Sequence, residues 1–264
     1  MKLFKLLSIG SLVVGLTPVA MAGRIVLTGH DNDFHQSTDA VAATKAELAW
    51  LGATASSKKI LVIDDGTQAK TLVEGIEGVA KVVTKSVGSV TAADFDFSTY
   101  SSFVVASIST CGGCDNPPGT GTALAAFSTS IGSFFNAGGG ILGLTSAGDP
   151  GGFAYAPEAA TGAFLSALTG FTATANGLAD IPGFTAVNGD FTHNTFSEPG
   201  TGGTSSKYKV AERLDKAAIT LYAEGLVACT GAGCGFVPEP ASLALVGLGV
   251  FGVGLSRRRA QVTV

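Results

Sequence analysis

Charged residues are scarce in this chain of 264 residues. Asp, Glu, Lys and Arg together make up 14% of it, against roughly 25% in an average soluble domain. The formal net charge is −4, which gives no sign of the clustered Lys and Arg that a nucleic-acid surface needs. We therefore expect no nucleic-acid partner.

Long hydrophobic runs are missing as well. The apolar run nearest the C-terminus, residues 241–255, is fifteen residues long, which gives roughly 22 Å of helix against a hydrocarbon core of ~30 Å. Glycine is abundant instead, with 37 residues. The remaining apolar segments are regular enough to argue against disorder.

The C-terminus has three distinct parts. Val237-Pro238-Glu239-Pro240 comes first, the apolar run 241–255 follows, and Arg257, Arg258 and Arg259 close it. This ending resembles the PEP-CTERM sorting tail of exported bacterial proteins. The resemblance implies processing by an exosortase near Pro238, Glu239 and Pro240, and release to the envelope or to the polymer outside it.

Physical chemistry supports a transient stay of this tail in the inner membrane. The arginines hold its C-terminal end on the cytoplasmic side, and the two prolines keep the preceding chain extended and accessible. Glycines at 247, 249, 252 and 254 allow another helix to approach closely. The alternatives are an ordinary single-span anchor or a buried core helix.

The N-terminus carries a second export feature. Lys2 and Lys5 precede an apolar stretch, and Ala20-Met21-Ala22 ends it, which is the pattern of a secretory signal peptide. We expect signal peptidase to cleave after Ala22. The chain thus divides into a signal peptide (1–22), a body (23–236) and a sorting tail (237–264).

The body alternates apolar strands with amphipathic helices, which predicts βαβ crossovers and a three-layer α/β domain with a mostly parallel sheet. The predicted strands are 24–28, 59–63, 80–87, 102–108, 141–144 and 218–223. The predicted helices are 38–52, 67–77, 122–136 and 157–168, and 195–206 is expected to be a long loop.

One segment sharpens the fold prediction. Residues 135–148 read FNAGGGILGLTSAG, and this sequence resembles the helix–strand–elbow of class I glutamine-amidotransferase-like proteins, including the ThuA-like branch. The resemblance implies a flavodoxin-like or amidotransferase-like sheet with a functional residue at the elbow. Cysteine or histidine is common there, whereas this chain has Thr145. A threonine needs an adjacent base to act as a nucleophile, and none can be placed, so the elbow is predicted to be degenerate.

Polar side chains cluster where predicted strands end, the place where open α/β sheets bind ligands. The candidate metal ligands, suited to Zn or Mn, are His30, Asp31, Asp33, His35 and Asp64. His193, in the segment 190–194, is the only other histidine. The alternative interpretation is that these residues satisfy turns and cap helices, with no cofactor bound.

The cysteines form two pairs, Cys111 with Cys114 and Cys229 with Cys234. An exported protein meets an oxidising environment, so we expect disulfides. Four cysteines allow three pairings, and the sequence does not choose among them. A four-thiolate Zn site and a redox-active pair are the alternatives.

These features favour a non-catalytic exported protein of the cell envelope or extracellular matrix. Its expected partners are signal peptidase, an exosortase, the inner membrane for a limited time, and an extracellular polysaccharide. The rival hypothesis is an extracellular metal-dependent hydrolase that uses His30, Asp33, His35 and Asp64. A measurement of the metal content of the protein distinguishes these two hypotheses.

Overall fold

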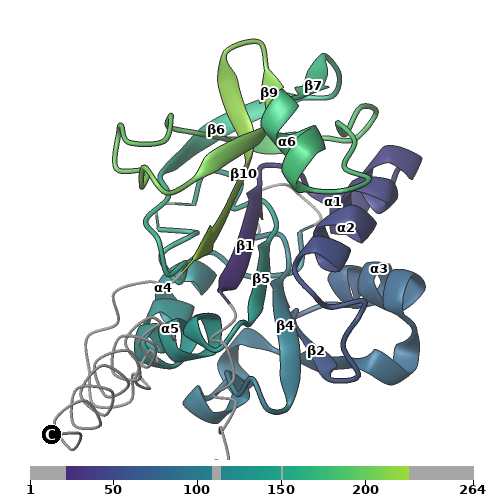
Figure 1. Cartoon of the computed structure of the whole chain (residues 1–264), viewed down its shortest axis with the longest axis vertical. Helices are drawn as coiled ribbons and strands as arrows, with labels where there is room; N and C mark the ends of the chain where they lie inside the picture. The colour runs from purple at the N-terminus through teal and green to yellow at the C-terminus, as the bar shows by residue number, and fades with distance from the viewer. Residues whose placement is uncertain (1–21, 109–113, 150, 226–264) are drawn as a thin grey trace, which may run out of the picture. The chain divides into compact units, whose positions relative to one another are not determined.

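A mixed sheet of ten strands runs through the part of the chain described by the computed structural model, residues 22–108, 114–149 and 151–225 (Figure 1). The strands are β1 (Gly23–Thr28), β2 (Lys59–Ile63), β3 (Val82–Lys85), β4 (Tyr100–Val105), β5 (Gly140–Gly143), β6 (Gly162–Ala167), β7 (Phe171–Ala173), β8 (Thr192–Phe196), β9 (Lys209–Leu214) and β10 (Ala217–Gly225). The α-helices are α1 (Asn32–His35), α2 (Thr38–Trp50), α3 (Gln68–Glu77), α4 (Thr120–Ala125), α5 (Ser128–Asn136) and α6 (Ala175–Asp180). Three short 3-10 helices are η1 (Val79–Lys81), η2 (Val87–Ser89) and η3 (Ala92–Asp94).

Five neighbouring strands are parallel, in the spatial order β3-β2-β4-β5-β1. If the strands are renumbered so that β2 is the first and β1 the fifth, this is the 2-1-3-4-5 order of one common type of doubly wound sheet. The strand order therefore reverses between β2 and β4. The predicted α/β class with a mostly parallel sheet is confirmed.

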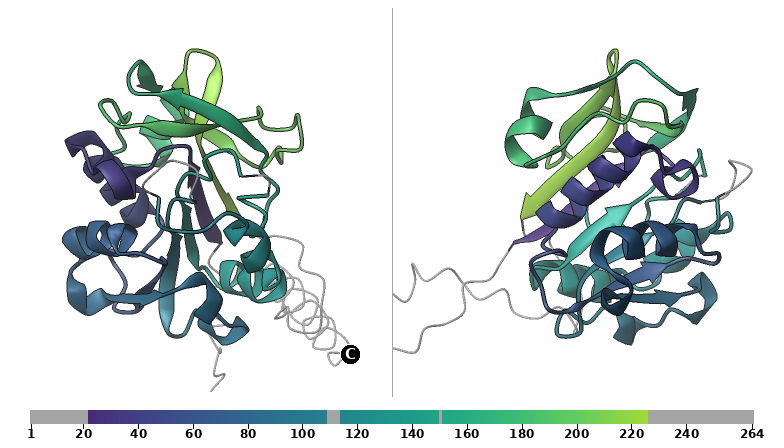
Figure 2. Two further views of the ribbon diagram at one scale, coloured as in Figure 1. Left: turned by 180° about the vertical axis from the view of Figure 1, so that it is seen from behind. Right: turned by 90° about the vertical axis from the view of Figure 1, so that its right-hand side faces the viewer.

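Helices cover both faces of the parallel strands (Figures 1 and 2). α2 and α3 pack on one face through Leu48 and Val73, against Val26, Val62 and Val104. α4 and α5 pack on the other face through the side chains Leu124, Ile131, Phe134 and Phe135. The connections β2–α3–β3 and β4–α4–α5–β5 step in opposite directions along the sheet and use opposite faces, as right-handed crossovers require.

The other end of the sheet is antiparallel. β10 pairs with β1 over the whole length of β1, from Gly23 opposite Gly225 to Thr28 opposite Thr220. β8 and β9 pair with β10, β6 pairs with β8, and β7 pairs with β9. This region closes over the carboxyl end of β1 and thereby brings late residues of the chain to the end of its first strand.

Two predicted helices differ from the structure. Residues 157–168 were expected to be one helix, but they contain the edge strand β6, which pairs with β8. Most of its side chains are exposed, so its apolar residues do not form the buried stripe of a helix. The helix predicted at 122–136 is interrupted at Ala126 and Phe127 between α4 and α5, and the expected loop 195–206 begins inside β8.

The signal peptide, except Ala22, and the whole tail from residue 237 lie outside the described residues, so the structure does not test their predicted roles. Among the residues that are described, no helix has the length and apolar character needed to cross a bilayer.

Candidate functional site

The carboxyl ends of β1, β2, β4 and β5 meet at one edge of the sheet, where the sequence places its candidate site residues. The structure divides these residues among separate groups rather than gathering them at one centre. Each group is held by different backbone elements, so each is described in turn.

The crevice between β2 and β4, where the strand order reverses, is occupied by Asn116. Its Nδ2 donates hydrogen bonds to the carbonyl oxygens of Ile63 (3.0 Å) and Ala106 (3.1 Å), and its Oδ1 accepts one from the N–H of Asp65 (3.0 Å). The side chain is fully buried. Doubly wound sheets bind ligands at such a point, and here the chain fills it with its own amide.

The carboxylates of Asp64 and Asp115 accept hydrogen bonds from backbone N–H groups at the start of α3. Asp64 accepts hydrogen bonds from the N–H groups of Gly66 (2.8 Å) and Lys70 (3.0 Å). Burial raises the pKa of Asp64, while these two hydrogen bonds oppose the shift. The Asp64 carboxylate therefore caps the first turn of α3. Asp64, a predicted metal ligand, is not in the group of potential ligands that includes His35.

The elbow residue Thr145 is buried and held by two hydrogen bonds. Its hydroxyl donates to Asn194 Oδ1 (2.7 Å) and accepts from the N–H of Ala147 (3.1 Å). The first residue after β5 with a left-handed backbone is Ala147 (φ 46°), two positions beyond Thr145. The hydroxyl contacts an amide oxygen and a backbone N–H, neither of which is a base.

His30 points into the protein. Its Nε2 lies 2.9 Å from Glu212 Oε2, and the Thr220 hydroxyl donates to the same oxygen (2.9 Å). Both His30 and Glu212 are fully buried. Nearby, burial and then the charge of Glu212 raise the pKa of Glu47 to about 8. His30 thus belongs to a buried polar network and is separate from His35.

Asp33 connects α1 to the end of β4. Its carboxylate accepts hydrogen bonds from the N–H (2.9 Å) and the hydroxyl of Ser107. Burial raises the pKa of Asp33 to about 7, although the hydrogen bonds from Ser107 favour the charged form. This contact explains Asp33 as a structural group.

The remaining two predicted residues, Asp31 and His35, meet two residues from far along the chain. His35 Nδ1 lies 3.1 Å from Asp31 Oδ2 and 3.2 Å from Asp190 Oδ1. His193 Nε2 lies 3.1 Å from the same Asp31 oxygen. We call Asp31, His35, Asp190 and His193 the Asp–His cluster.

Burial differs across the Asp–His cluster. The two carboxylate side chains are fully buried, while His193 is 12% exposed and His35 is 33% exposed. Burial, and next the charge of Asp31, raise the pKa of Asp190. The rings of Phe34 and Phe191 pack against His35. The cluster is therefore a polar centre with solvent access from the histidine side.

The sequence indicates only half of this cluster. Asp31 and His35 lie four positions apart, on one turn that includes α1. Asp190 and His193 are brought to the cluster by the start of β8, where Thr192 forms an antiparallel β-bridge with His30. The segment 190–194 has a visible histidine, but its pairing with the first strand is a long-range contact that no local pattern reveals.

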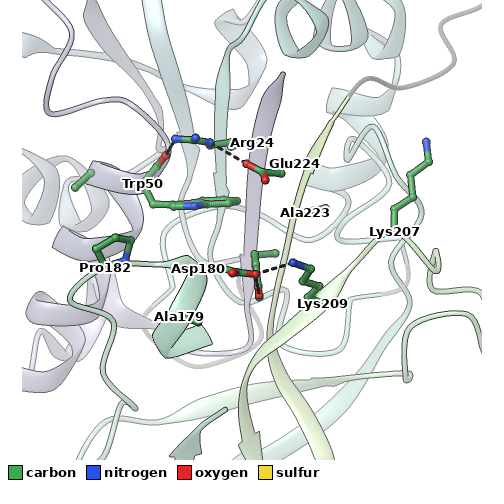
Figure 3. A pocket seen from close by; sticks show the side chains of 11 residues that line it. Arg24, Trp50, Ala179, Asp180, Pro182, Lys207, Lys209, Ala223 and Glu224 are labelled. Carbon is green, nitrogen blue, oxygen red and sulfur yellow. Dashed lines mark hydrogen bonds and ion pairs between the residues drawn. The ribbon is translucent and has the colours of Figure 1, made fainter. Parts of the chain in front are cut away.

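A pocket of about 580 Å³ lies at the opposite edge, beside the amino end of β1 (Figure 3). Four of its charged groups are paired with each other: Arg24 with Glu224 (3.3 Å) and Lys209 with Asp180 (2.6 Å). Lys207 also lines the pocket and pairs with Glu158 (2.6 Å). The Tyr222 hydroxyl also donates to Asp180 (2.7 Å). The pocket is thus remote from the carboxyl ends of the parallel strands, and each of its charged side chains has an ion-pair partner.

Of the four cysteines, Cys114 alone lies within the described residues, where it is buried. No cysteine in that part of the chain is a free thiol. The pairing with Cys111, Cys229 and Cys234 stays a prediction, because those three lie outside the described residues.

Comparison with known proteins identifies the tail. Residues 236–259 match the PEP-CTERM protein-sorting motif, which confirms the predicted sorting tail and indicates an exported, exosortase-sorted protein. No curated protein and no solved structure matches the chain. The amidotransferase-like resemblance of the body therefore stays a prediction.

Proposed function

We propose that the protein is an exported component of the cell envelope or extracellular matrix with a non-catalytic α/β body. In this proposal signal peptidase cleaves after Ala22, and the apolar segment 241–255 and the arginines that follow hold the chain in the inner membrane for a limited time. An exosortase then releases it near Pro238-Glu239-Pro240. The observation that carries the proposal is the match of residues 236–259 to the sorting motif.

Two features of the body support the absence of catalysis. The Thr145 hydroxyl is buried and engaged by Asn194 and Ala147, so it lacks the adjacent base that a nucleophile requires. The crevice between β2 and β4 is filled by Asn116. We interpret the body as a degenerate amidotransferase-like domain that serves in binding or assembly, with extracellular polysaccharide as the partner class.

The rival hydrolase has less support. It uses His30, Asp33, His35 and Asp64 around one metal ion. Three of these side chains make contacts of their own: His30 with Glu212, Asp33 with Ser107, and Asp64 with the first turn of α3. A shared metal would have to break all three sets of contacts.

Substitution of the motif tests the proposed route. Pro238→Ala combined with Glu239→Ala should preserve membrane insertion but prevent processing, so that a longer form accumulates in the membrane fraction. A matched control, Pro182→Ala in the body, should be processed like the wild type. Normal release of the double variant would contradict processing at this motif.

A further inference from the structure

We propose that the Asp–His cluster binds one divalent transition-metal ion, with Zn²⁺ as the preferred ion. The ligands are Asp31, His35, Asp190 and His193. Two of these ligands, Asp31 and His35, are among the five predicted from the sequence. Asp190 and His193 take the place of the other three predicted ligands. It is independent of the proposed export route.

The positions of the ligand atoms fit one small cation. Asp31, His35 and Asp190 each offer one ligand atom that lies within 4.8 Å of the other two. Three measured separations, including that from His193 Nε2 to Asp31 Oδ2, are 3.1 to 3.2 Å. Zinc bonds of about 2.0–2.2 Å in a tetrahedron separate neighbouring ligands by roughly 3.3–3.6 Å. These three separations are within a few tenths of an ångström of those in a zinc site. His193 lies outside the group of three whose ligand atoms are mutually within 4.8 Å, so its side chain would have to move toward the ion.

An unsatisfied atom at the same place provides independent support. Asp31 Oδ1 is buried and has no hydrogen-bond partner among the described residues. A buried acceptor without a partner costs free energy, and a carboxylate costs far more than a neutral group. Oδ1 belongs to the carboxylate whose Oδ2 contacts both histidines, so an ion bound there would also lie close to Oδ1.

The charges of the cluster also require compensation. Asp31 and Asp190 are two fully buried carboxylates, and buried charges in proteins are paired or coordinate metals. In the described part of the chain, the basic side chains within ion-pair distance of these two carboxylates are His35 and His193 alone. One divalent ion would balance both carboxylates while the histidines remain neutral ligands.

The donor set selects the class of metal. Two imidazoles with two carboxylates suit borderline ions such as Zn²⁺, whereas Mg²⁺ and Ca²⁺ prefer oxygen ligands throughout. His35, one third exposed, gives a route of entry. The bound ion would join the segment after β1 to the segment that leads into β8, and so resist separation of the parallel strands from the antiparallel ones.

Metal titration of the full chain tests the proposal. The protein, solubilised in detergent and treated with a chelator, should bind one Zn²⁺ in calorimetry and in elemental analysis. Asp190→Asn and His193→Gln should each weaken binding by at least about 100-fold, since even the loss of residues that only support metal ligands costs about 10–100-fold. Asp33→Asn is the matched control: it alters a buried carboxyl in the same segment and should keep the wild-type affinity.

X-ray absorption spectroscopy at the zinc edge, carried out on the zinc-loaded wild type, gives a result that does not depend on how the variants fold. The expected spectrum has nitrogen and oxygen ligands with an imidazole contribution and no sulfur. A sulfur shell would place the ion at the cysteines and overturn the proposal. Failure of the wild type to bind, or unchanged binding by folded Asp190→Asn and His193→Gln, would overturn it as well.

Discussion

The carboxylate of Asp115 accepts a hydrogen bond of 2.9 Å from the backbone N–H of Gln68, the first residue of α3. The same oxygen accepts from the N–H of Thr67 (2.9 Å). A helix N-terminus at this position of a doubly wound sheet is where a ligand's anionic group commonly binds. Here a side chain from a distant loop supplies the negative charge, and Asn116 fills the crevice beside it.

Removal of this carboxylate should destabilise the protein. Asp115→Ala leaves the first N–H groups of α3 without their acceptor, and we expect a loss of about 1 kcal/mol in the free energy of unfolding, as for helix caps generally. Asp115→Asn keeps an acceptor oxygen and should lose less than half as much. Urea unfolding measures both, and equal stability of Asp115→Ala and wild type would show that the contact contributes nothing.

Thr145 should matter for stability and not for catalysis. Thr145→Ala removes a buried hydroxyl that bridges Asn194 and Ala147. Asn194 Oδ1 keeps the hydrogen bond from the N–H of Ser146 (2.8 Å), so we expect a loss of about 1 kcal/mol, the net contribution of a typical hydrogen bond. Thr145→Ser keeps the hydroxyl and should be milder. Neither the wild type nor either variant should release ammonia from glutamine, and ammonia release that Thr145→Ala abolishes would refute the non-catalytic account.

Glu47 should make stability depend on pH. Its pKa is raised from 4.5 to about 8 in the folded protein, so between these values the folded state retains a proton that the unfolded state has lost. Stability therefore falls as the pH rises through this window. Glu47→Gln should remove the contribution of Glu47 to this dependence, and the stability of the variant relative to wild type should rise from pH 5 to pH 8 by on the order of 2–4 kcal/mol.

The change between the two pH values separates the titration of Glu47 from any packing effect of the substitution. Glu74→Gln, at a partly exposed position of α3, is the control and should show no comparable trend. A constant difference between Glu47→Gln and wild type at both pH values would contradict the raised pKa.

The cysteines should be oxidised in the exported protein. Disulfides persist outside the cytoplasm, so thiol labelling of denatured, unreduced protein from the envelope should find no free thiol at Cys111, Cys114, Cys229 or Cys234. Labelling of all four would contradict the disulfide prediction and favour a thiolate metal site.

The sequence predicts the parallel half of the sheet well, because strands covered on both faces contain uninterrupted apolar residues. β4 is buried at every position, and β2 is buried at all but Lys59. The antiparallel half gives a weaker pattern. β6 is a largely exposed edge strand in which Phe164 is 61% exposed, so the sequence predicts a helix there. It does not predict β7, β8, β9 or α6.

The contacts of the candidate site likewise fall into those that the sequence predicts and those that it does not. Asp31 and His35 are close in sequence, so their proximity could be predicted. Local spacing cannot show that His30 faces Glu212 or that Asp190 approaches His35, because both contacts depend on the antiparallel strands that close over β1. Long-range strand pairing decides which polar residues meet.

The intact mass of the protein isolated from its native host tests the central claim most directly. The account predicts that the mature chain begins at Gly23, because signal peptidase removes residues 1–22. It also predicts that the chain ends near Pro238-Glu239-Pro240, so the apolar segment and its arginines are absent. A chain that still ends at Val264 would contradict the account, since the tail would then be an ordinary membrane anchor.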